Sequence, residues 1–531
     1  MTWESIAATK RQVLRDSIPA EWLIPDTIFP SEDQLDVTNF PRESGFFTEN
    51  ELKITSSPAP TILSHISSGS WTSEMVTEAF CKTAAVAQQL TNCLSEIFFD
   101  KAILQAKELD AYFQKTGKTK GPLHGLPISL KDNINVIGYD STIGFTSLVN
   151  KPAINNSTIV DLLLEAGAVI YCKTNVPTAM MISETVNNLF GRTVNPLNRS
   201  LTTGGSSGGE AALIAFGGGR IGVGSDIGGS LRMPAACTGI FTIRPSSGRF
   251  PNCQSRACLE GQETVNGVIG PLAKSLEEIV LWARVIIGQN PWIRDPKCLP
   301  IPWRSVEMKE RLKIAVLWND GVVTPTPPVA RALKETVEKL EAAGHETITW
   351  ASTEHTEMLA LLGGIFLADG GKSVRKLLEP TGEPFRPEMK PYEEANDIGV
   401  YDLWQMQVKR NSLCKSYLDR WNEAGIDAIL CPTTPYSSVK HDKFAYAGYT
   451  CVFNLLDYPA VSFPCGIKTD KAVDTPYDDH QALSDMDAQI QNNYSEESVH
   501  GMPISLQLVG RRLSEESLLA MTDLILKSIT L

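Results

Sequence analysis

The stretch from residue 126 to residue 172 decides the fold class. It begins with LPISL at 126–130, an apolar run that leads into polar residues, and it closes with STIVDLLLEAGAVIYC at 157–172. The first run predicts a buried strand that delivers polar side chains at its end. In the second, Ser157 can cap a helix that stops at Gly167, and the last five residues predict another strand. This order of strand, helix and strand favours parallel strands joined by a crossover helix.

The alternation of helices and strands continues on both sides of this stretch. Upstream, Thr72 or Ser73 can cap the first of two helices that we expect between residues 72 and 115. Downstream, short apolar runs predict strands and longer amphipathic runs predict helices, so the chain as a whole reads as an α/β protein. The expected strands cover 312–318, 427–431, 460–463 and 504–509, and the expected helices are one that stops at Gly344 and one over about 403–421.

The composition limits the classes of function. The 531 residues include 48 Lys and Arg against 61 Asp and Glu, and the net charge of −13 disfavours nucleic acid and anionic membranes as partners. The most apolar later stretch, 358–368, has about half of the roughly 20 residues that a membrane span needs, and the start of the chain lacks the pattern of an export signal. Eleven scattered cysteines without CxxC pairs fit free thiols. We expect a cytoplasmic protein without a membrane span.

We expect one domain over residues 1–531. Two segments stand apart from the α/β pattern. The first is an amino-terminal helical arm over about 1–70, which starts with an amphipathic helix. The second is the stretch 469–500, in which eight acidic residues stand against one lysine. That charge pattern is typical of an acidic surface loop.

Two glycine-rich segments hold serines that could do chemistry. They are TTGGSSGGE at 202–210 and GSDIGGSLR at 224–232, and such backbone can turn sharply and approach a ligand closely. A phosphate-binding loop would need Lys and then Ser or Thr after its last glycine, but Glu210 occupies that position. GGSSG also matches the GxSxG pattern of a nucleophile elbow, yet the residues before it are polar, and His500 precedes the last expected strand instead of following it. Both interpretations are therefore disfavoured.

A lysine at the end of a strand offers another way to activate these serines. Lys131 follows the apolar run 126–130 directly, and Ser-Lys pairs are a known nucleophile system. A lysine acts as a base only when its amine is neutral, and burial favours the neutral form by lowering the pKa from about 10.4. From the residues alone, an ordinary ion pair of Lys131 with Asp132 or Asp226 is an equal alternative.

These segments resemble the motifs of the amidase signature family, in the expected order. The matching segments are GLPISLKD at 125–132, the run from Lys173 to Pro196, GGSSGGE at 204–210, DIGGSLR at 226–232, GPL at 270–272 and QLVGR at 507–511. The resemblance covers nearly the whole chain. In its length and its amino-terminal segment, the chain is most similar to fungal acetamidases and general amidases. It implies the amidase signature fold, in which a large mixed β-sheet is covered by helices on both faces.

The resemblance implies a Ser-Ser-Lys triad. Ser230 matches the nucleophile, Ser206 matches the bridging serine that follows an unusual cis peptide, and Lys131 matches the base. In that mechanism Lys131 takes a proton from Ser230 through Ser206, Ser230 attacks the amide carbonyl, and water hydrolyses the acyl-enzyme. The family chemistry needs no metal and no organic cofactor.

Further positions match supporting residues of the family. Ser207, Asp226 and Arg232 match residues that orient the triad, and a plain ion pair of Asp226 with Arg232 is the alternative. Met180 matches a substrate-contacting position of the fatty-acid amide hydrolase branch, and ordinary apolar lining is the alternative there. The backbone amides that match the oxyanion hole belong to Ile227, Gly228, Gly229 and Ser230.

The resemblance implies hydrolysis of a linear carboxamide, such as acetamide or another monocarboxylic amide, to a carboxylate and ammonia or an amine. The expected partner is a small-molecule amide, and a homodimer stays open. Hydrolysis of carbamates, esters or fatty-acid amides uses the same chemistry and is the alternative. A transamidase subunit that passes ammonia to transfer RNA with partner chains is a further alternative, which the net charge of −13 disfavours.

Overall fold

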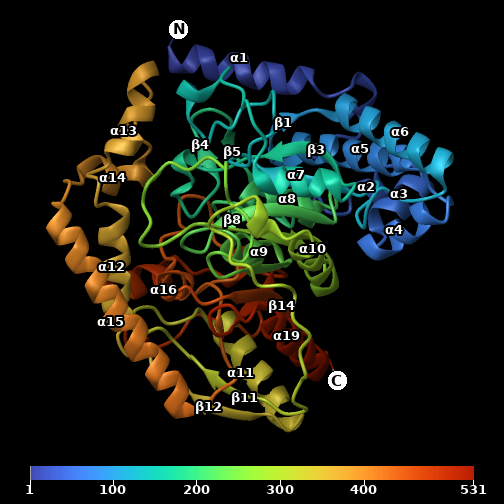
Figure 1. Ribbon diagram of the computed structural model, residues 1–531. Coiled ribbons are helices and arrows are strands. Elements are labelled where there is room, and N and C mark those ends of the chain that lie inside the picture. The colour runs from blue at the N-terminus through green and yellow to red at the C-terminus, as the bar shows by residue number, and fades with distance from the viewer. Residues whose placement is uncertain (1, 531) are drawn as a thin grey trace.

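A mixed sheet of eleven strands runs through the centre of the molecule (Figure 1). The computed structural model describes residues 2–530. The strands follow one another in the spatial order β1 (Leu94–Ile97), β3 (Val169–Thr174), β2 (Pro127–Lys131), β8 (Ile221–Asp226), β10 (Val268–Ala273), β9 (Phe241–Arg244), β14 (Ala460–Lys468), β15 (Pro503–Val509), β13 (Ala428–Pro432), β11 (Lys313–Val316) and β12 (Glu346–Thr349). Two small hairpins lie outside this sheet, β4 (Val186–Asn187) with β5 (Gly191–Arg192) and β6 (Val194–Asn195) with β7 (Asn198–Thr202).

β2 lies between two parallel neighbours, β3 and β8. The helix α7 (Thr158–Glu165) connects β2 to β3 as the expected crossover. β11 also pairs in parallel with β12 and β13. The strands between these two parallel parts are antiparallel: β8 pairs with β10, β10 with β9, β9 with β14, and β14 with β15. The carboxyl end of β2 therefore opens beside the carboxyl end of β8, which is where a parallel pair places its functional loops.

Most of the predicted elements are present, but five strands of the central sheet were not predicted: β1, β8, β9, β10 and β12. The predicted strands of the second half are β11, β13, β14 and β15, and the two early helices are α5 (Ser73–Thr91), capped by Thr72, and α6 (Phe99–Thr116). Between these two helices lies β1, which the sequence analysis did not predict. β1 has only four residues and leads directly into α6, so the helical pattern on both sides hides it.

Alternating side chains of the strands pack into cores on opposite faces of the sheet. Ile314 and Leu430 belong to one core, whereas their neighbours Ala315 and Ile429 belong to another. Helices cover both faces, as the family resemblance implies. The helices of the first face are α7, α10 (Leu276–Gly288), α11 (Pro327–Ala342) and α19 (Glu515–Thr530), and those of the second are α8 (Gly208–Phe216), α9 (Arg232–Thr238), α12 (His355–Phe366), α15 (Val400–Ala424) and α16 (Gly448–Leu456).

The amino-terminal residues contain several helices. Figure 1 shows the first helix, α1 (Trp3–Asp16), along the end of the molecule where β1 and β4 lie. Lys10 fixes this helix, because its buried amine pairs with Glu96 of β1 and, at 3.0 Å, with Asp140. The chain continues with α2 (Phe40–Glu43), α3 (Glu49–Ser56) and α4 (Ala59–Ser67).

The acidic segment 469–500 is more ordered than the surface loop that its charge pattern predicts. It contains α17 (Asp485–Asn493) and α18 (Glu496–Val499), and two of its aspartates are buried. Asp474 accepts a hydrogen bond from Arg331 at 2.7 Å, and Asp487 accepts one from Thr324 at 3.0 Å. Both donors lie more than 140 positions away in the chain, so the local pattern carries no sign of them.

The remaining helices are the short α13 (Lys372–Leu378) and α14 (Lys390–Glu394), which precede α15. Within residues 2–530, no helix combines the length and the apolar character that crossing a membrane requires.

Candidate active site

Lys131 is the last residue of β2, and its side chain is completely buried. Its Nζ donates hydrogen bonds to the hydroxyl of Ser206 at 2.8 Å and to the hydroxyl of Ser225 at 2.9 Å. The carbonyl oxygen of Ser225 lies 3.3 Å from the same nitrogen. The structure therefore surrounds the amine of Lys131 with serine oxygens.

The two carboxylates considered as ion-pair partners of Lys131 have other partners. Asp226 pairs with Arg232 at 3.1 Å. Asp132 accepts a hydrogen bond from the Ser95 hydroxyl at 2.8 Å and another from the Ile143 amide at 2.6 Å. The simple ion pair is thus not the arrangement that the chain adopts.

The surroundings of Lys131 favour a neutral amine. Burial lowers the pKa of Lys131 to about 7, and the negative charges of Asp226, Glu210 and Asp132 oppose that shift. A solvent-exposed lysine would keep its proton up to about pH 10.4. At neutral pH, Lys131 can therefore accept a proton from a neighbouring hydroxyl.

Ser206 and Ser207 lie on the turn that starts α8. The peptide between Gly205 and Ser206 is cis, as the family resemblance implies. A Cβ on Gly205 would lie 2.7 Å from the carbonyl oxygen of Ile182, so a larger residue would not fit there. The Ser207 amide donates to the Ser230 carbonyl at 3.2 Å, and this bond holds the two glycine-rich segments together.

Ser230 lies on the turn between β8 and α9, which the Asp226 carboxylate organises. That carboxylate accepts hydrogen bonds from the amide of Gly229 at 2.7 Å and from the amide of Leu231 at 3.2 Å. Burial alone would raise the pKa of Asp226, but the Arg232 guanidinium and further partners lower it to about 2. Asp226 is therefore a permanent negative charge at the base of this turn.

Arg232 connects the same turn to the carboxyl-terminal half of the chain. Its guanidinium is fully buried and donates to the Thr450 carbonyl at 3.1 Å, to Asn454 at 2.5 Å and to Gln507 at 3.2 Å. The ion pair of Arg232 with Asp226 is thus present, and it also holds the turn in place.

Three of the four amides expected to form an oxyanion hole are free to do so. Those of Ile227, Gly228 and Ser230 have no hydrogen-bond partner in the part of the chain that the structure describes. Gly229 departs from the expectation, because its amide already donates to Asp226. Gly229 has a φ of 131°, and a Cβ there would lie 2.2 Å from the Thr450 hydroxyl oxygen. This position needs glycine for the shape of the turn.

Ser206 and Ser230 line one cavity of about 410 Å³. Their hydroxyls share no hydrogen bond with each other in the structure of residues 2–530. Met180 lines the same cavity, which agrees both with substrate contact and with ordinary apolar lining. The other apolar side chains of the wall include Met181, Ile227, Phe250, Leu259 and Val268.

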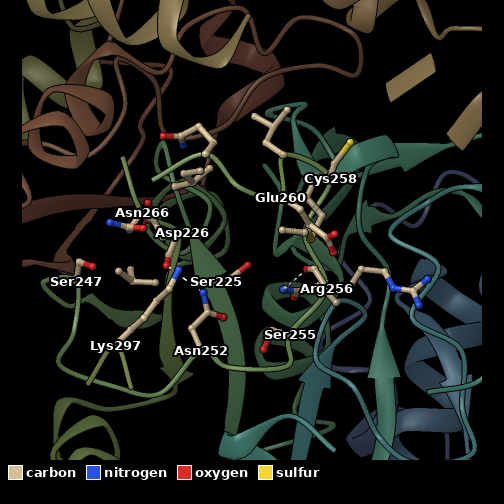
Figure 2. A pocket seen from close by; sticks show the side chains of 18 of the residues that line it. Ser225, Asp226, Ser247, Asn252, Ser255, Arg256, Cys258, Glu260, Asn266 and Lys297 are labelled. Carbon is tan, nitrogen blue, oxygen red and sulfur yellow. Dashed lines mark hydrogen bonds between the residues drawn. The ribbon is translucent and has the colours of Figure 1, made fainter. Parts of the chain in front are cut away.

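The segment 252–267 forms much of the remaining wall of the cavity. Figure 2 shows Asn252 and Lys297 on one side of the cavity and Cys258 and Glu260 on the other. The segment carries no recognisable motif, so only the folded structure reveals its place.

Two polar residues beside Lys131 were also missed. No sequence pattern marks Ser225, because its contact with Lys131 depends on the pairing of β2 with β8. Glu210 served in the sequence only as a reason against a phosphate loop, yet it is completely buried at the start of α8. Among residues 2–530, no cluster of three or more His, Cys, Asp or Glu side chains could hold a metal ion.

The site combines a buried lysine, two serines on glycine-rich turns and free backbone amides around one cavity. Such a set can activate a hydroxyl as nucleophile and stabilise an oxyanion, which is the chemistry of hydrolases that work by acyl transfer. The family model described as Amidase matches residues 75–519, and the chain belongs to this family. It is a hydrolase that acts on amides.

Individual relatives agree with this assignment. The chain is 43% identical to an acetamidase of Emericella nidulans, over 98% of this chain and 97% of that protein. It is 41% identical to an acetamidase of Aspergillus oryzae, over 98% of each. Among solved structures, it is similar to a fatty acid amide hydrolase with a TM-score of 0.95 and 33% identity, over 99% of this chain and 95% of that one. The expected amidase signature fold is confirmed.

Proposed function

We propose that this chain hydrolyses linear carboxamides through a Ser-Ser-Lys triad formed by Ser230, Ser206 and Lys131. The observation that carries the proposal is the buried hydrogen bond of 2.8 Å between Lys131 Nζ and the Ser206 hydroxyl, at a cavity that Ser230 also lines. Because burial disfavours the ammonium form, the amine of Lys131 is able to take up a proton.

In the first half of the reaction, Ser230 becomes the nucleophile. Lys131 takes the proton of the Ser206 hydroxyl while Ser206 takes that of Ser230, and the Ser230 oxygen attacks the carbonyl carbon of the amide. The free amides of Ile227, Gly228 and Ser230 then bind the developing oxyanion. Donors of this kind contribute roughly 10²- to 10³-fold each in rate. The relay requires the Ser230 side chain to turn toward Ser206 when substrate binds.

In the second half, the proton returns and the acyl group leaves. Lys131 gives its proton back through Ser206 to the amide nitrogen, the C–N bond breaks, and ammonia or an amine departs as a neutral molecule. Water then attacks the ester carbonyl and gives a proton through Ser206 to Lys131. The bond to Ser230 breaks to release the acid, and the proton returns through Ser206 to the Ser230 oxygen. Lys131 thus serves as base and as acid in turn.

We assign short monocarboxylic amides such as acetamide as the substrates. Two relatives at 41% and 43% identity are acetamidases. Polar side chains line part of the cavity, which disfavours burial of a long alkyl chain there; they include Asn252, Ser255, Asn266 and Lys297. Fatty-acid amides are the second candidate, supported by the likeness to the fatty acid amide hydrolase and by the apolar wall at Met180 and Phe250.

We also place this enzyme in the cytoplasm. All eleven cysteines are free thiols, and such a count of unpaired cysteines fits a reducing compartment.

The test is turnover of acetamide, a long-chain amide, an aryl amide and ethyl carbamate, with release of ammonia or amine as the readout. Wild type should act on at least one of them, and Ser230→Ala should lose on the order of 10³-fold or more of that activity. Ser67→Ala, on the exposed surface of α4, is the matched control and should keep it. Undiminished turnover in Ser230→Ala would disprove the assigned nucleophile, and the ranking of the four compounds decides between the candidate substrates.

A further inference from the structure

Glu210 is a buried carboxylate near the proposed catalytic base. It lies in the first turn of α8, four residues after Ser206, and its exposed fraction is 0%. Its oxygens accept hydrogen bonds from the hydroxyl of Ser129 and, at 2.7 Å, from that of Thr174. Burying a carboxylate is unfavourable unless other groups compensate, and the mechanism described above does not use it.

Three neighbouring strands form a floor beneath the Glu210 carboxylate. Ser129 stands two residues before Lys131 on β2, so both side chains point to the same face. Thr174 of β3 is the residue paired with Lys131 across the two strands. Gly222 of β8 pairs with Ser129, and a Cβ there would lie 1.8 Å from a carboxylate oxygen of Glu210. The missing side chain at Gly222 therefore makes room for this carboxylate beside Lys131.

Three carboxylates act on the charge of Lys131, and two of them serve another cation as well. Asp226 pairs with Arg232 at 3.1 Å. Asp132 also acts on the buried Lys173, and it accepts hydrogen bonds from several neighbours. The remaining carboxylate is that of Glu210 in α8, and the cation whose charge acts on it is Lys131.

The other titratable groups around Glu210 stay neutral while Lys131 titrates. They are the thiols of Cys93 and Cys172 and the phenol of Tyr171. Burial raises the pKa of Cys93 to about 12 and raises the pKa of Cys172 and of Tyr171 well above their ordinary values. Glu210 is thus the group on this side of Lys131 whose charge changes near neutral pH.

We propose that Glu210 is a positioning residue for the base, whose buried negative charge holds the Lys131 amine against Ser206 and sets the pH at which that amine loses its proton. The inference rests on the proposed Ser-Ser-Lys mechanism and assigns one more residue to it. A negative charge at this place stabilises the ammonium that forms when Lys131 takes the proton from Ser206, and it makes Lys131 a stronger base.

The protonation of Glu210 itself fits this role. Burial raises its pKa to about 7, and the hydrogen bonds from Ser129 and Thr174 together with the charge of Lys131 oppose that shift. Above neutral pH, Glu210 is ionised, and its charge acts on Lys131 in the range where the base works. Removing the charge should therefore make Lys131 lose its proton at a lower pH.

The experiment is the pH dependence of kcat/KM for wild type and Glu210→Gln, on the amide that wild type turns over fastest. The acid limb of Glu210→Gln should move to lower pH by about one unit or more, since the two buried charges act on each other through a low dielectric. The plateau of kcat should fall as well, because the base is weaker.

Glu278→Gln is the matched control. Glu278 is also fully buried, but it pairs with Arg220 at 2.8 Å and lies in α10, on the opposite face of the sheet. Its replacement should lower the melting temperature and leave the acid limb in place. If Glu210→Gln behaves in the same way, with lower stability and an unmoved acid limb, Glu210 is merely structural and the inference is wrong.

Two further variants complete the test. If Glu210→Gln does not fold, Thr174→Val is used in its place. Loss of the 2.7 Å hydrogen bond from Thr174 keeps Glu210 protonated to higher pH, so the acid limb should move to lower pH by a smaller amount. An unmoved acid limb overturns the proposal. Lys131→Met separates this inference from the mechanism beneath it. Wild-type turnover in Lys131→Met would refute the triad itself, whatever Glu210 does.

Discussion

Lys131 shows how strongly the chemistry of one side chain depends on what surrounds it. The same lysine at the surface would be a permanent cation. At the end of β2 it is completely buried among the oxygens of Ser206 and Ser225, and burial brings its pKa to about 7. A lysine can replace the histidine of other hydrolases only in such a place.

The pH profile of the wild-type enzyme follows from this pKa. Because the charged form of Lys131 is inactive as a base, kcat/KM should be constant at alkaline pH and should fall about tenfold for each pH unit below about 7. The measurement is initial rates at low substrate concentration across the pH range in which the protein stays folded. An acid limb near the pKa of an ordinary carboxylate, about 4, would show that another group controls the reaction.

At the scale of the elements, the active site depends on how one turn is held. The turn between β8 and α9 carries Ser230 and the free amides. Its apolar side chains, Ile227 and Leu231, pack against two different cores. Arg232 in addition ties the turn to α16 and β15 through Thr450, Asn454 and Gln507. Segments that lie more than 200 residues apart in the chain thereby position the nucleophile.

Breaking this link should destabilise the protein strongly. Arg232→Met leaves Asp226 as a buried carboxylate without its cation, and losing one partner of a buried ion pair costs about 3–5 kcal/mol. The free energy of unfolding in denaturant measures the loss, and turnover should fall with it because the turn loosens.

A surface ion pair provides the comparison for this prediction. Arg294 pairs with Glu165 at 2.8 Å, with 42% and 53% of the two side chains exposed. Arg294→Met should change stability by no more than about 1 kcal/mol. Equal effects of the two substitutions would mean that the link through Arg232 does not stabilise the turn.

At the scale of the whole molecule, one continuous sheet joins the two halves of the chain. β9 pairs with β10 on one side and with β14 on the other, so strands from the first 273 residues and from the last 219 share one set of hydrogen bonds. The cores on both faces also draw on both halves. We therefore propose that the chain folds as a single domain.

Limited proteolysis tests the single domain. The segment 302–309 has no regular secondary structure, and Lys309 has 66% of its side chain exposed, so a protease should cut there first. The two fragments should stay together in gel filtration under native conditions and separate only in denaturant. Two fragments that elute apart and each keep a cooperative unfolding transition would show that the chain has two domains.

The local pattern of the sequence was enough for six strands of the central sheet, and the family resemblance proposed the three triad positions. Apolar runs and caps located β2, β3 and α5, because burial and capping act over a few neighbouring residues. The motif match assigned Lys131, Ser206 and Ser230. In the structure Ser206 and Ser230 line one cavity, and Lys131 donates a hydrogen bond to Ser206. The sequence pattern did not reveal β1, which is too short for a periodic signal, nor the burial of Asp474 and Asp487 in the acidic segment.

What the sequence by itself determined is the α/β class, the amidase family and the residues able to do chemistry, since these depend on residue types and short spacings. Only the tertiary structure decided which groups surround each of them. Ser225 and Glu210 reach Lys131 through the pairing of β2 with β3 and β8, and the Gly229 amide is taken by Asp226. Burial and strand pairing are properties of segments brought together from across the chain, and these properties set the pKa of Lys131 and the number of amides free to bind an oxyanion.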